Sequence, residues 1–284
     1  MTEKEEPHPD LNPLFFVKLG GSLITDKRIR ATPRLGIIRQ LAEELAEVLR
    51  ASPSLRILFG HGSGSFGHWE ANQYGTRNGV RSADEWYGFA RVSAAALQLN
   101  RIVVQSFVYA GVPMLSLQPA ASTLARHGVI TKLELDPIRR ALTHGLVPLV
   151  FGDVAFDEAI GGTILSTEDV FVHVAKALRP SWVLLLGNAP GVLDNNRQTI
   201  PVITPETYPQ VKEHLRRSGY TDVTGGMADK VERMVTLVER LPGLRVRIMS
   251  GNEAGHLRDA LARPAESTSG TLICALPPGP RYCC

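Results

Sequence analysis

The sequence predicts an α/β fold: a three-layer αβα sandwich with a mainly parallel central sheet. Short apolar runs that end in glycine or turn residues alternate along the chain with longer stretches whose apolar residues have helical spacing. Strands that alternate with helices imply crossover connections, which place helices on both faces of a parallel sheet. Of the 284 residues, 44% are hydrophobic and 21% are charged, which is typical of a globular protein and excludes disorder over most of the chain.

In the first half of the chain, the strands are short apolar runs that glycines close, and the helices are longer segments with leucine, isoleucine and valine on one face. Gly111 ends the longest helical pattern, as glycine commonly does after the last turn of a helix. The expected elements are, in order, a strand at 14–19, a helix at 34–50, a strand at 56–59, a helix at 83–110 and a strand at 113–117.

The second half repeats this alternation and adds a hairpin-like stretch around Gly161-Gly162. A Ser-Thr-Glu-Asp sequence precedes one helical pattern, and a Gly-Gly pair precedes another. The expected elements are a helix at 134–144, a strand at 147–151, the hairpin at 154–165, helices at 168–178, 206–218, 226–240 and 254–262, and strands at 182–186, 244–249 and 271–275.

No internal repeat or linker divides the sequence, so one domain is expected over 14–276. Its two lobes would share one sheet and meet near Arg179-Pro180, with an N-lobe at about 14–180 and a C-lobe at about 181–276. Residues 1–13 and 277–284 are expected to form a flexible start and a tail.

The cysteine and charge content predicts a cytoplasmic protein that binds neither nucleic acid nor membranes. Three cysteines without a Cys-x-x-Cys pair support neither structural zinc nor a disulfide framework. The N-terminus lacks the apolar core of a signal peptide, and no second membrane signal accompanies the terminal Cys283-Cys284. A net charge of +3 without a dense basic stripe argues against nucleic-acid binding.

Chemically distinctive residues follow the first expected strand. Lys18 stands at its end, Gly20, Gly21 and Ser22 come next, and Lys27 lies nine residues after Lys18. Adjacent glycines let the backbone approach a bulky anion with free N–H groups, and two lysines suit the charge that develops on a transferring phosphoryl group. The ordinary alternative is a Gly-Gly turn beside two solvated lysines.

A second glycine-rich segment, Gly60–His68, directly follows another strand. It matches neither a Walker A loop nor a spaced dinucleotide-binding fingerprint. Its N–H groups, including those of Gly62 and Ser63, are suited to phosphate oxygens, and His68 is able to donate a hydrogen bond to an anion. A flexible linker that carries a surface histidine is the structural alternative.

Two further groups lie near expected strand and helix ends. Gly152 and Asp153 follow the strand at 147–151, and a Ser-Thr-Glu-Asp sequence opens the helix after the hairpin. Carboxylates at these positions are able to orient lysines or to hold Mg²⁺ through water. For Thr167, Glu168 and Asp169 we favour ordinary helix capping, because this sequence is a common helix start.

The segment Asp222–Lys230 places two glycines before a helix and Lys230 one turn inside it. A helix N-terminus with a lysine suits a phosphate, because the N–H groups and the dipole both attract negative charge. Gly226 and Lys230 are therefore candidate phosphate ligands, although Lys230 also fits an exposed surface position. Together, the glycine turns and the lysines predict phosphoryl transfer between two phosphate-bearing molecules, achieved by positioning and electrostatics.

These motifs, in this order, resemble the amino acid kinase superfamily and, within it, are most similar to isopentenyl phosphate kinases. The resemblance runs from about residue 14 to 275, and its most specific part is Ser65-Phe66-Gly67-His68. It implies an amino acid kinase-like fold and an enzyme that phosphorylates isopentenyl phosphate to isopentenyl diphosphate, with ATP as co-substrate and Mg²⁺. It also suggests a homodimer.

The resemblance also implies residue roles. Lys18, Lys27 and His68 would be catalytic, and Gly152 with Asp153 would close the site near the transferring group. The substrate phosphate would lie against Gly62 and His68, and the helix with Trp86, Phe89, Val92 and Leu97 would flank the apolar tail. The residues expected at ATP are Lys18, Gly20, Gly21, Ser22, Ser63, Asn188, Gly226 and Lys230. No protein metal site is expected.

One segment departs from the family pattern. Where relatives carry Leu-Thr-Asp-x-Asp-Gly-Val, this chain has Leu186–Val192 with a glycine, Asn188 and a proline in place of threonine and two aspartates. The contacts to adenine or ribose and the nucleotide preference are therefore open. So are three other functions: a kinase of another small phosphate or phosphonate such as fosfomycin, an acylating kinase for glutamate or aspartate, and a nucleotide-binding sensor without turnover.

Overall fold

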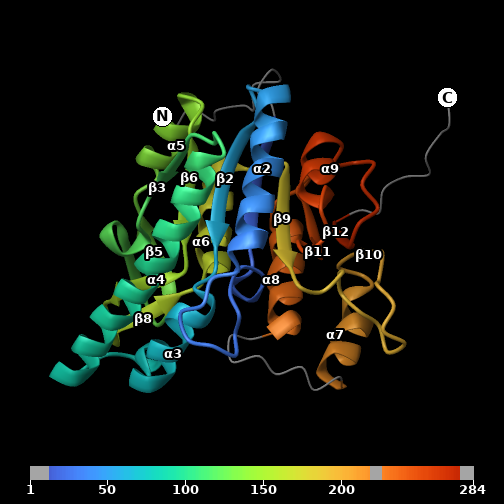
Figure 1. The fold of residues 1–284 in the computed structure, drawn as a ribbon. Helices are drawn as coiled ribbons and strands as arrows, with labels where there is room; N and C mark the ends of the chain where they lie inside the picture. Colours follow the sequence, from blue (N-terminus) through green and yellow to red (C-terminus); the bar gives the residue numbers. More distant parts are fainter. Residues whose placement is uncertain (1–12, 218–225, 276–284) are drawn as a thin grey trace, which may run out of the picture.

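An eight-stranded, mainly parallel sheet forms the centre of the molecule (Figure 1). The computed structural model describes residues 13–217 and 226–275. The strand order is β10-β12-β11-β9-β1-β2-β6-β3, and β11 with β12 is the antiparallel pair in it. The strands are β1 (Leu14–Leu19), β2 (Arg56–His61), β3 (Met114–Ser116), β6 (Val147–Phe151), β9 (Trp182–Gly187), β10 (Val202–Ile203), β11 (Arg245–Ser250) and β12 (Thr271–Cys274).

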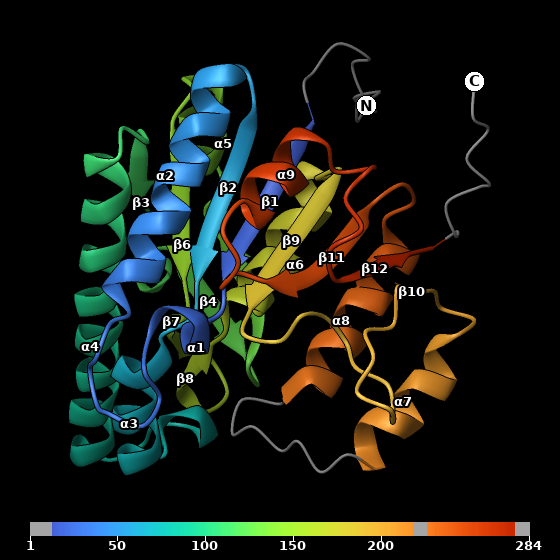
Figure 2. The same ribbon diagram turned by 45° about the vertical axis from the view of Figure 1, so that its right-hand side comes forward.

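Helices cover both faces of this sheet, so the predicted three-layer sandwich is confirmed (Figures 1 and 2). On one face lie α2 (Leu35–Ala51), α4 (Ala83–Tyr109) and α9 (His256–Ala262). On the other lie α5 (Asp136–Thr143), α6 (Thr167–Leu178) and α8 (Gly226–Arg240), with α7 (Tyr208–Arg217) against α8. Strand β1 is buried along its whole length and supplies alternate side chains to the two cores, which is the pattern of a central parallel strand.

A second sheet of four strands lies beyond the carboxyl end of β6, in the order β5-β4-β7-β8. Its strands are β4 (Thr123–Arg126), β5 (Val129–Leu133), β7 (Asp153–Asp157) and β8 (Gly161–Leu165). The predicted hairpin is confirmed as the antiparallel pair β7–β8. Because Gly152 alone separates β6 from β7, the chain passes there directly from the large sheet into the small one.

The glycine-rich segment Gly60–His68 is not the continuous loop that its composition predicts. Its first two residues complete β2, and helix α3 (Gly64–Tyr74) begins three residues later. Glycines are poor helix formers, but here close packing requires them: a Cβ on Gly67 would lie 2.6 Å from the Ser63 side chain, and Gly64 has a φ of +50°. His68 therefore lies on a helix.

The other elements agree with the sequence apart from short additions. Each expected strand and helix is present within a few residues, and α4 is one continuous helix. The unexpected elements are α1 (Gly21–Ile24), two 3₁₀ turns (Thr76–Asn78 and Pro119–Ala121), α3, β4, β5 and β10. Short strands of the small sheet escaped prediction because they lack a long apolar run. None of the helices in the described part of the chain has the length and apolar character that crossing a bilayer needs.

Helices α3 and α4 pack closely at Gly88, and this contact yields a stability prediction. A Cβ on Gly88 would lie 2.3 Å from Cγ and 2.4 Å from Cβ of Tyr74, and the Cβ atom moves only with the backbone of α3. We expect Gly88→Ala to lower the free energy of unfolding by about 1–3 kcal/mol, because overpacking outweighs the gain in helix propensity.

The matched control is Gly36→Ala in the first turn of α2, where an added Cβ meets nothing within 4 Å among the described residues. This variant should be neutral or up to about 1 kcal/mol more stable. Urea titrations of both variants measure the difference, and equal effects would contradict the close approach of α3 and α4.

Candidate active site

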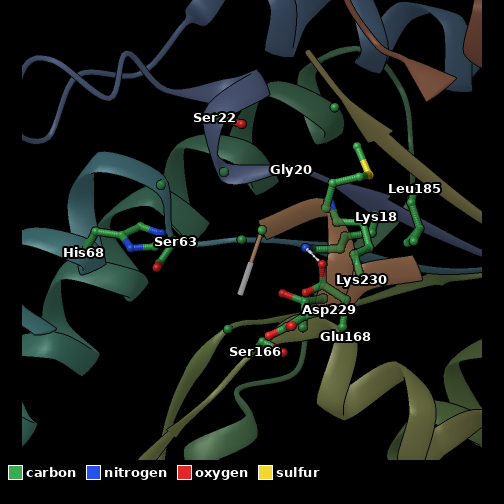
Figure 3. Close-up of a pocket in the computed structure, with 18 of the residues that line it drawn as sticks. Lys18, Gly20, Ser22, Ser63, His68, Ser166, Glu168, Leu185, Asp229 and Lys230 are labelled. Carbon is green, nitrogen blue, oxygen red and sulfur yellow. Dashed lines mark hydrogen bonds and ion pairs between the residues drawn. The ribbon is translucent and has the colours of Figure 1, made fainter. Parts of the chain in front are cut away.

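A cavity of 1320 Å³ opens where β1, β2, β6 and β9 end, at the edge of the sheet where ligands of parallel α/β folds bind (Figure 3). Each of these strands contributes its end or the residue after it. The residues concerned are Lys18, Gly62, Gly152 and Gly187. The starts of α1, α3, α6 and α8 complete the wall, so four helix N-termini face one space.

Lys18 forms a buried ion pair with Glu168 of α6 at the floor of this cavity (Figure 3). Lys18 shares a face of β1 with Phe16, and α6 packs on that face. One turn after Glu168, Phe171 packs against Phe16 in a tilted arrangement with ring centroids 5.1 Å apart. The same helix–strand contact therefore places an aromatic pair in the core and an ion pair at the cavity.

The charge state of Glu168 is set by two lysines. Burial raises the pKa of this carboxyl, but the positive charges of Lys18 and Lys230 and the hydrogen bond from Lys18 outweigh it and lower the pKa to about 2. Figure 3 shows Lys18 and Lys230 beside Glu168. A carboxylate between two ammonium groups holds them close together despite their mutual repulsion, and both line the cavity.

Two glycine turns lie against each other above this group. A Cβ on Gly21 would stand 2.5 Å from the backbone N of Gly64, so only glycine permits the contact. The N–H of Gly62 donates to the carbonyl of Leu19 (3.0 Å), and the buried hydroxyl of Thr25 donates to Gly21 (2.7 Å). The backbone of both turns is thereby fixed next to the space that a phosphate chain would occupy.

His68 projects into the cavity from the second turn of α3, close to Ser63 (Figure 3). Ser63 is the N-cap residue of α3, and no side chain caps this helix. An anion beside Gly62 and Ser63 would thus meet the positive end of the α3 dipole and the imidazole of His68.

The wall beyond His68 contains an apolar patch, which Asn72, Arg77 and Asn78 border. Ala71 of α3, Val92 and Ala96 of α4, and Ile164 of β8 line this part of the cavity. The family resemblance implies that α4 flanks an apolar tail, and of the four α4 residues expected there Val92 lines the cavity. Trp86, Phe89 and Leu97 do not line the cavity: Phe89 is buried behind its wall in a cluster with Val80 and Val92, and the other two are exposed.

On the opposite side, Asn188 joins three segments. Its amide donates to the carbonyl of Ser22 (2.9 Å) and accepts from Arg34 (3.2 Å) and Asn252 (3.3 Å). Asn188 thus braces the first glycine turn as well as lining the cavity. Nearby, Arg233 of α8 pairs with Asp169 of α6 and ties the helix that carries Lys230 to the helix that carries Glu168.

All but one of the sequence-predicted site residues line this cavity. The group comprises Lys18, Gly20, Gly21, Ser22, Lys27, Gly62, Ser63, His68, Gly152, Asn188, Gly226 and Lys230. The exception is Asp153, which is buried away from the cavity lining and accepts a hydrogen bond from Gln118 (3.2 Å). Burial raises its pKa. The structure does not bring Asp153 to the cavity, because it opens β7 and its side chain is buried inside the protein. Residues 222–225 of the fourth motif lie outside the described part of the chain.

Helix capping was expected for Thr167, Glu168 and Asp169, and of these three Asp169 alone caps the helix. Ser166 and Asp169 form a reciprocal capping box, with Asp169 N donating to Ser166 Oγ at 3.1 Å. Thr167 instead donates to the carbonyl of His61 (2.6 Å), and Glu168 pairs with Lys18. Sequence reasoning missed the position of Glu168 because only packing reveals that α6 lies over Lys18.

Comparison with known proteins matches residues 13–250 to the amino acid kinase family. The chain belongs to this family. It is 30% identical over 278 residues to an isopentenyl phosphate kinase from Methanothermobacter thermautotrophicus, a match that covers 92% of this chain and 98% of that protein. It is 34% identical to the isopentenyl phosphate kinase from Haloferax volcanii, with 79% and 88% covered. A solved isopentenyl phosphate kinase structure superposes with a TM-score of 0.76 at 26% identity, covering 92% of this chain and 99% of that one.

The buried ion pair between Lys18 and Glu168 predicts that substitutions of these two residues affect the free energy of unfolding non-additively. Their side chains are 9% and 11% exposed, so removing one partner leaves a buried charge. We expect Glu168→Gln to lower the free energy of unfolding by about 3–5 kcal/mol, and the Lys18→Met/Glu168→Gln double variant to lose at least about 1 kcal/mol less than the sum of the single variants.

The control is the exposed pair of Arg139 and Asp136, whose side chains are 50% and 68% exposed. Its coupling in the same double-mutant cycle should be about 0–1 kcal/mol. A coupling equally small for Lys18 and Glu168 would show that the two charges are not paired in the folded protein.

The low pKa of Glu168 also predicts a pH dependence. Because folding lowers this pKa from 4.5 to about 2, the stabilisation is complete above the unfolded value and is lost as the pH falls toward 2. The stability difference between wild type and Glu168→Gln should therefore be constant above about pH 5 and shrink below pH 4.5. Chemical unfolding at a series of pH values measures it, and a difference that grows on acidification would refute the assignment.

Proposed function

We propose that this enzyme transfers the γ-phosphoryl group of ATP to isopentenyl phosphate and forms isopentenyl diphosphate. The observation that carries the proposal is the order in which different surfaces line one cavity. An apolar patch comes first, His68 follows it, and the lysines around Glu168 come last. Such an order suits an acceptor with a short apolar tail and a phosphate head that meets a second phosphate chain. The similarity to isopentenyl phosphate kinases over nearly the whole chain supports the same assignment.

In this proposal the acceptor binds on the N-lobe side. Its phosphate lies against Gly62 and His68, where the imidazole donates a hydrogen bond, and its tail lies along Ala71, Val92 and Ile164. The nucleotide lies on the C-lobe side. The residues proposed to contact it are Lys18, Gly20, Gly21, Ser22, Ser63, Asn188, Gly226 and Lys230.

The reaction needs no protein nucleophile. An oxygen of the acceptor phosphate attacks the γ-phosphorus, the bond from that phosphorus to the β,γ-bridging oxygen breaks, and ADP leaves. Lys18 and Lys27 lower the energy of the charge that builds on the transferring group, and Lys230 neutralises the departing diphosphate. Gly152 closes the cavity floor without a side chain.

Mg²⁺ is part of the proposal, although the described residues do not form a complete set of protein ligands for it. Among the described residues, no three histidine, cysteine, aspartate or glutamate side chains converge as metal ligands. Nucleotide phosphates and water would therefore provide most of the ligands, as is common for this ion in phosphoryl transfer. We also propose a cytoplasmic homodimer, which sedimentation velocity and cell fractionation would test.

The substrate assignment is tested by ADP release with a panel of acceptors. Isopentenyl phosphate should be turned over most efficiently, dimethylallyl phosphate less so, and fosfomycin and glutamate at least about 100-fold less, because neither fills the apolar pocket beside His68. Omitting Mg²⁺ should abolish turnover. Absence of turnover with both prenyl phosphates would refute the proposal, and efficient fosfomycin phosphorylation would replace it with the phosphonate-kinase alternative.

His68 is tested by substitution. His68→Ala should lower kcat/KM for isopentenyl phosphate by about 10²–10³-fold, since it removes a donor that faces the acceptor phosphate. The dissociation constant for ATP should change less than about threefold. His144→Ala is a matched control, because His144 lies at the end of α5 and outside the cavity lining, and it should leave both constants unchanged. Equal losses of acceptor turnover and ATP affinity would place His68 at the nucleotide instead.

A further inference from the structure

A buried carboxylate stands outside the active-site cavity and has no part in the reaction described above. The side chain of Glu70 is 5% exposed, and its Oε1 accepts hydrogen bonds from Arg30 and, at 3.2 Å, from Arg91. Its Oε2 is buried and has no hydrogen-bond partner among the described residues. These three side chains line a separate cavity of 290 Å³. A buried carboxylate is costly without a cation, so Glu70 depends on the two arginines.

The three residues come from the three segments that carry the proposed acceptor site. Glu70 is two residues after His68 on α3, and Arg91 precedes Val92 on α4. Arg30 belongs to the connection between α1 and α2 that carries Lys27. Through Glu70, the Lys27 segment is therefore tied to the helix that presents His68 and to the helix that lines the apolar pocket.

Backbone hydrogen bonds join the two ends of the Lys27 segment, residues 25–33. Among the described residues, strand pairing does not continue to the tip of this segment. Thr25 and Pro33 form an isolated antiparallel bridge, and Asp26 N donates to Thr32 O (2.9 Å). Ala31 N donates to the carbonyl of Ser65 on α3 (3.2 Å). Ala31 adopts a φ of +51°, a left-handed conformation that a non-glycine residue keeps only when its surroundings enforce it.

We propose that Glu70 is a positioning residue for phosphoryl transfer: through Arg30 it fixes the Lys27 segment against α3 and so sets the separation between Lys27 and His68. Its kinetic consequence rests on the proposed function, whereas the structural tie does not. Placement matters because a displacement of about 1 Å in a reacting group lowers turnover by as much as about 10²-fold. Arg91 supplies the second positive charge beside Glu70.

The test combines hydrogen–deuterium exchange with kinetics on Glu70→Gln, which keeps the shape of the side chain and removes its charge. Exchange in the peptide that covers residues 26–32 should accelerate at least about fivefold, while peptides from the rest of α3 and α4 change less than about twofold. For isopentenyl phosphate, kcat should fall about tenfold with KM for ATP within about twofold of wild type.

Two further variants make the result interpretable. Arg30→Gln removes the tie but leaves Glu70 paired with Arg91, and because Arg30 is 52% exposed this variant tests the proposal even if Glu70→Gln does not fold. It should reproduce both effects. Asp136→Asn breaks the exposed pair with Arg139 and should change neither measurement.

Unchanged exchange at residues 26–32 in both Arg30→Gln and Glu70→Gln would overturn the proposal. So would an equal rise over α3, α4 and the Lys27 segment, which indicates general destabilisation, or faster local exchange with kcat unchanged. If the wild type does not phosphorylate prenyl phosphates, the proposed function fails, and the exchange experiment alone then decides whether Glu70 holds the Lys27 segment.

Discussion

The ion pair between Lys18 and Glu168 is the interaction on which the arrangement of the site depends. Lys18 stands on a central strand of the sheet, where β2 and β9 flank it and its side chain is buried at the floor of the cavity. The fold keeps an ammonium group there because α6 brings a carboxylate to it, and the same carboxylate attracts Lys230 from α8. A strand, two helices and the charge of the cavity floor are thus coupled through one side chain.

Around this ion pair, the two sides of the cavity carry different kinds of chemical groups. Glycine turns at the ends of β1 and β2 bring backbone without side chains to the cavity, which is where we propose that the phosphates bind. Helices α3 and α4 add a histidine and an apolar wall on one side, while Asn188 and the start of α8 form the other. Because both sides open into one cavity, two phosphate-bearing molecules would meet end to end above Lys18.

The sequence predicted the central strands and the glycines that line the cavity because both leave local signals, apolar runs and glycine-rich turns at strand ends. It did not predict that Gly64–His68 is helical, since glycine propensity opposes a helix and only packing against α4 and the Thr25 segment overrides it. Asp153 does not line the cavity, because Gly152 faces it and the next residue in an extended chain turns to the opposite side. The ion pair of Glu168 was not predicted, because the Ser-Thr-Glu-Asp sequence around this residue is typical of a helix N-cap.

The position of β1 has a consequence for how the enzyme opens and closes. Strand β1 is hydrogen-bonded along its length to β2 of the N-terminal half and to β9 of the C-terminal half. Rotation of the two halves about a hinge would shear that ladder in the middle of the core. The sheet therefore acts as one rigid unit on which the cavity is built, rather than as two lobes that close on each other.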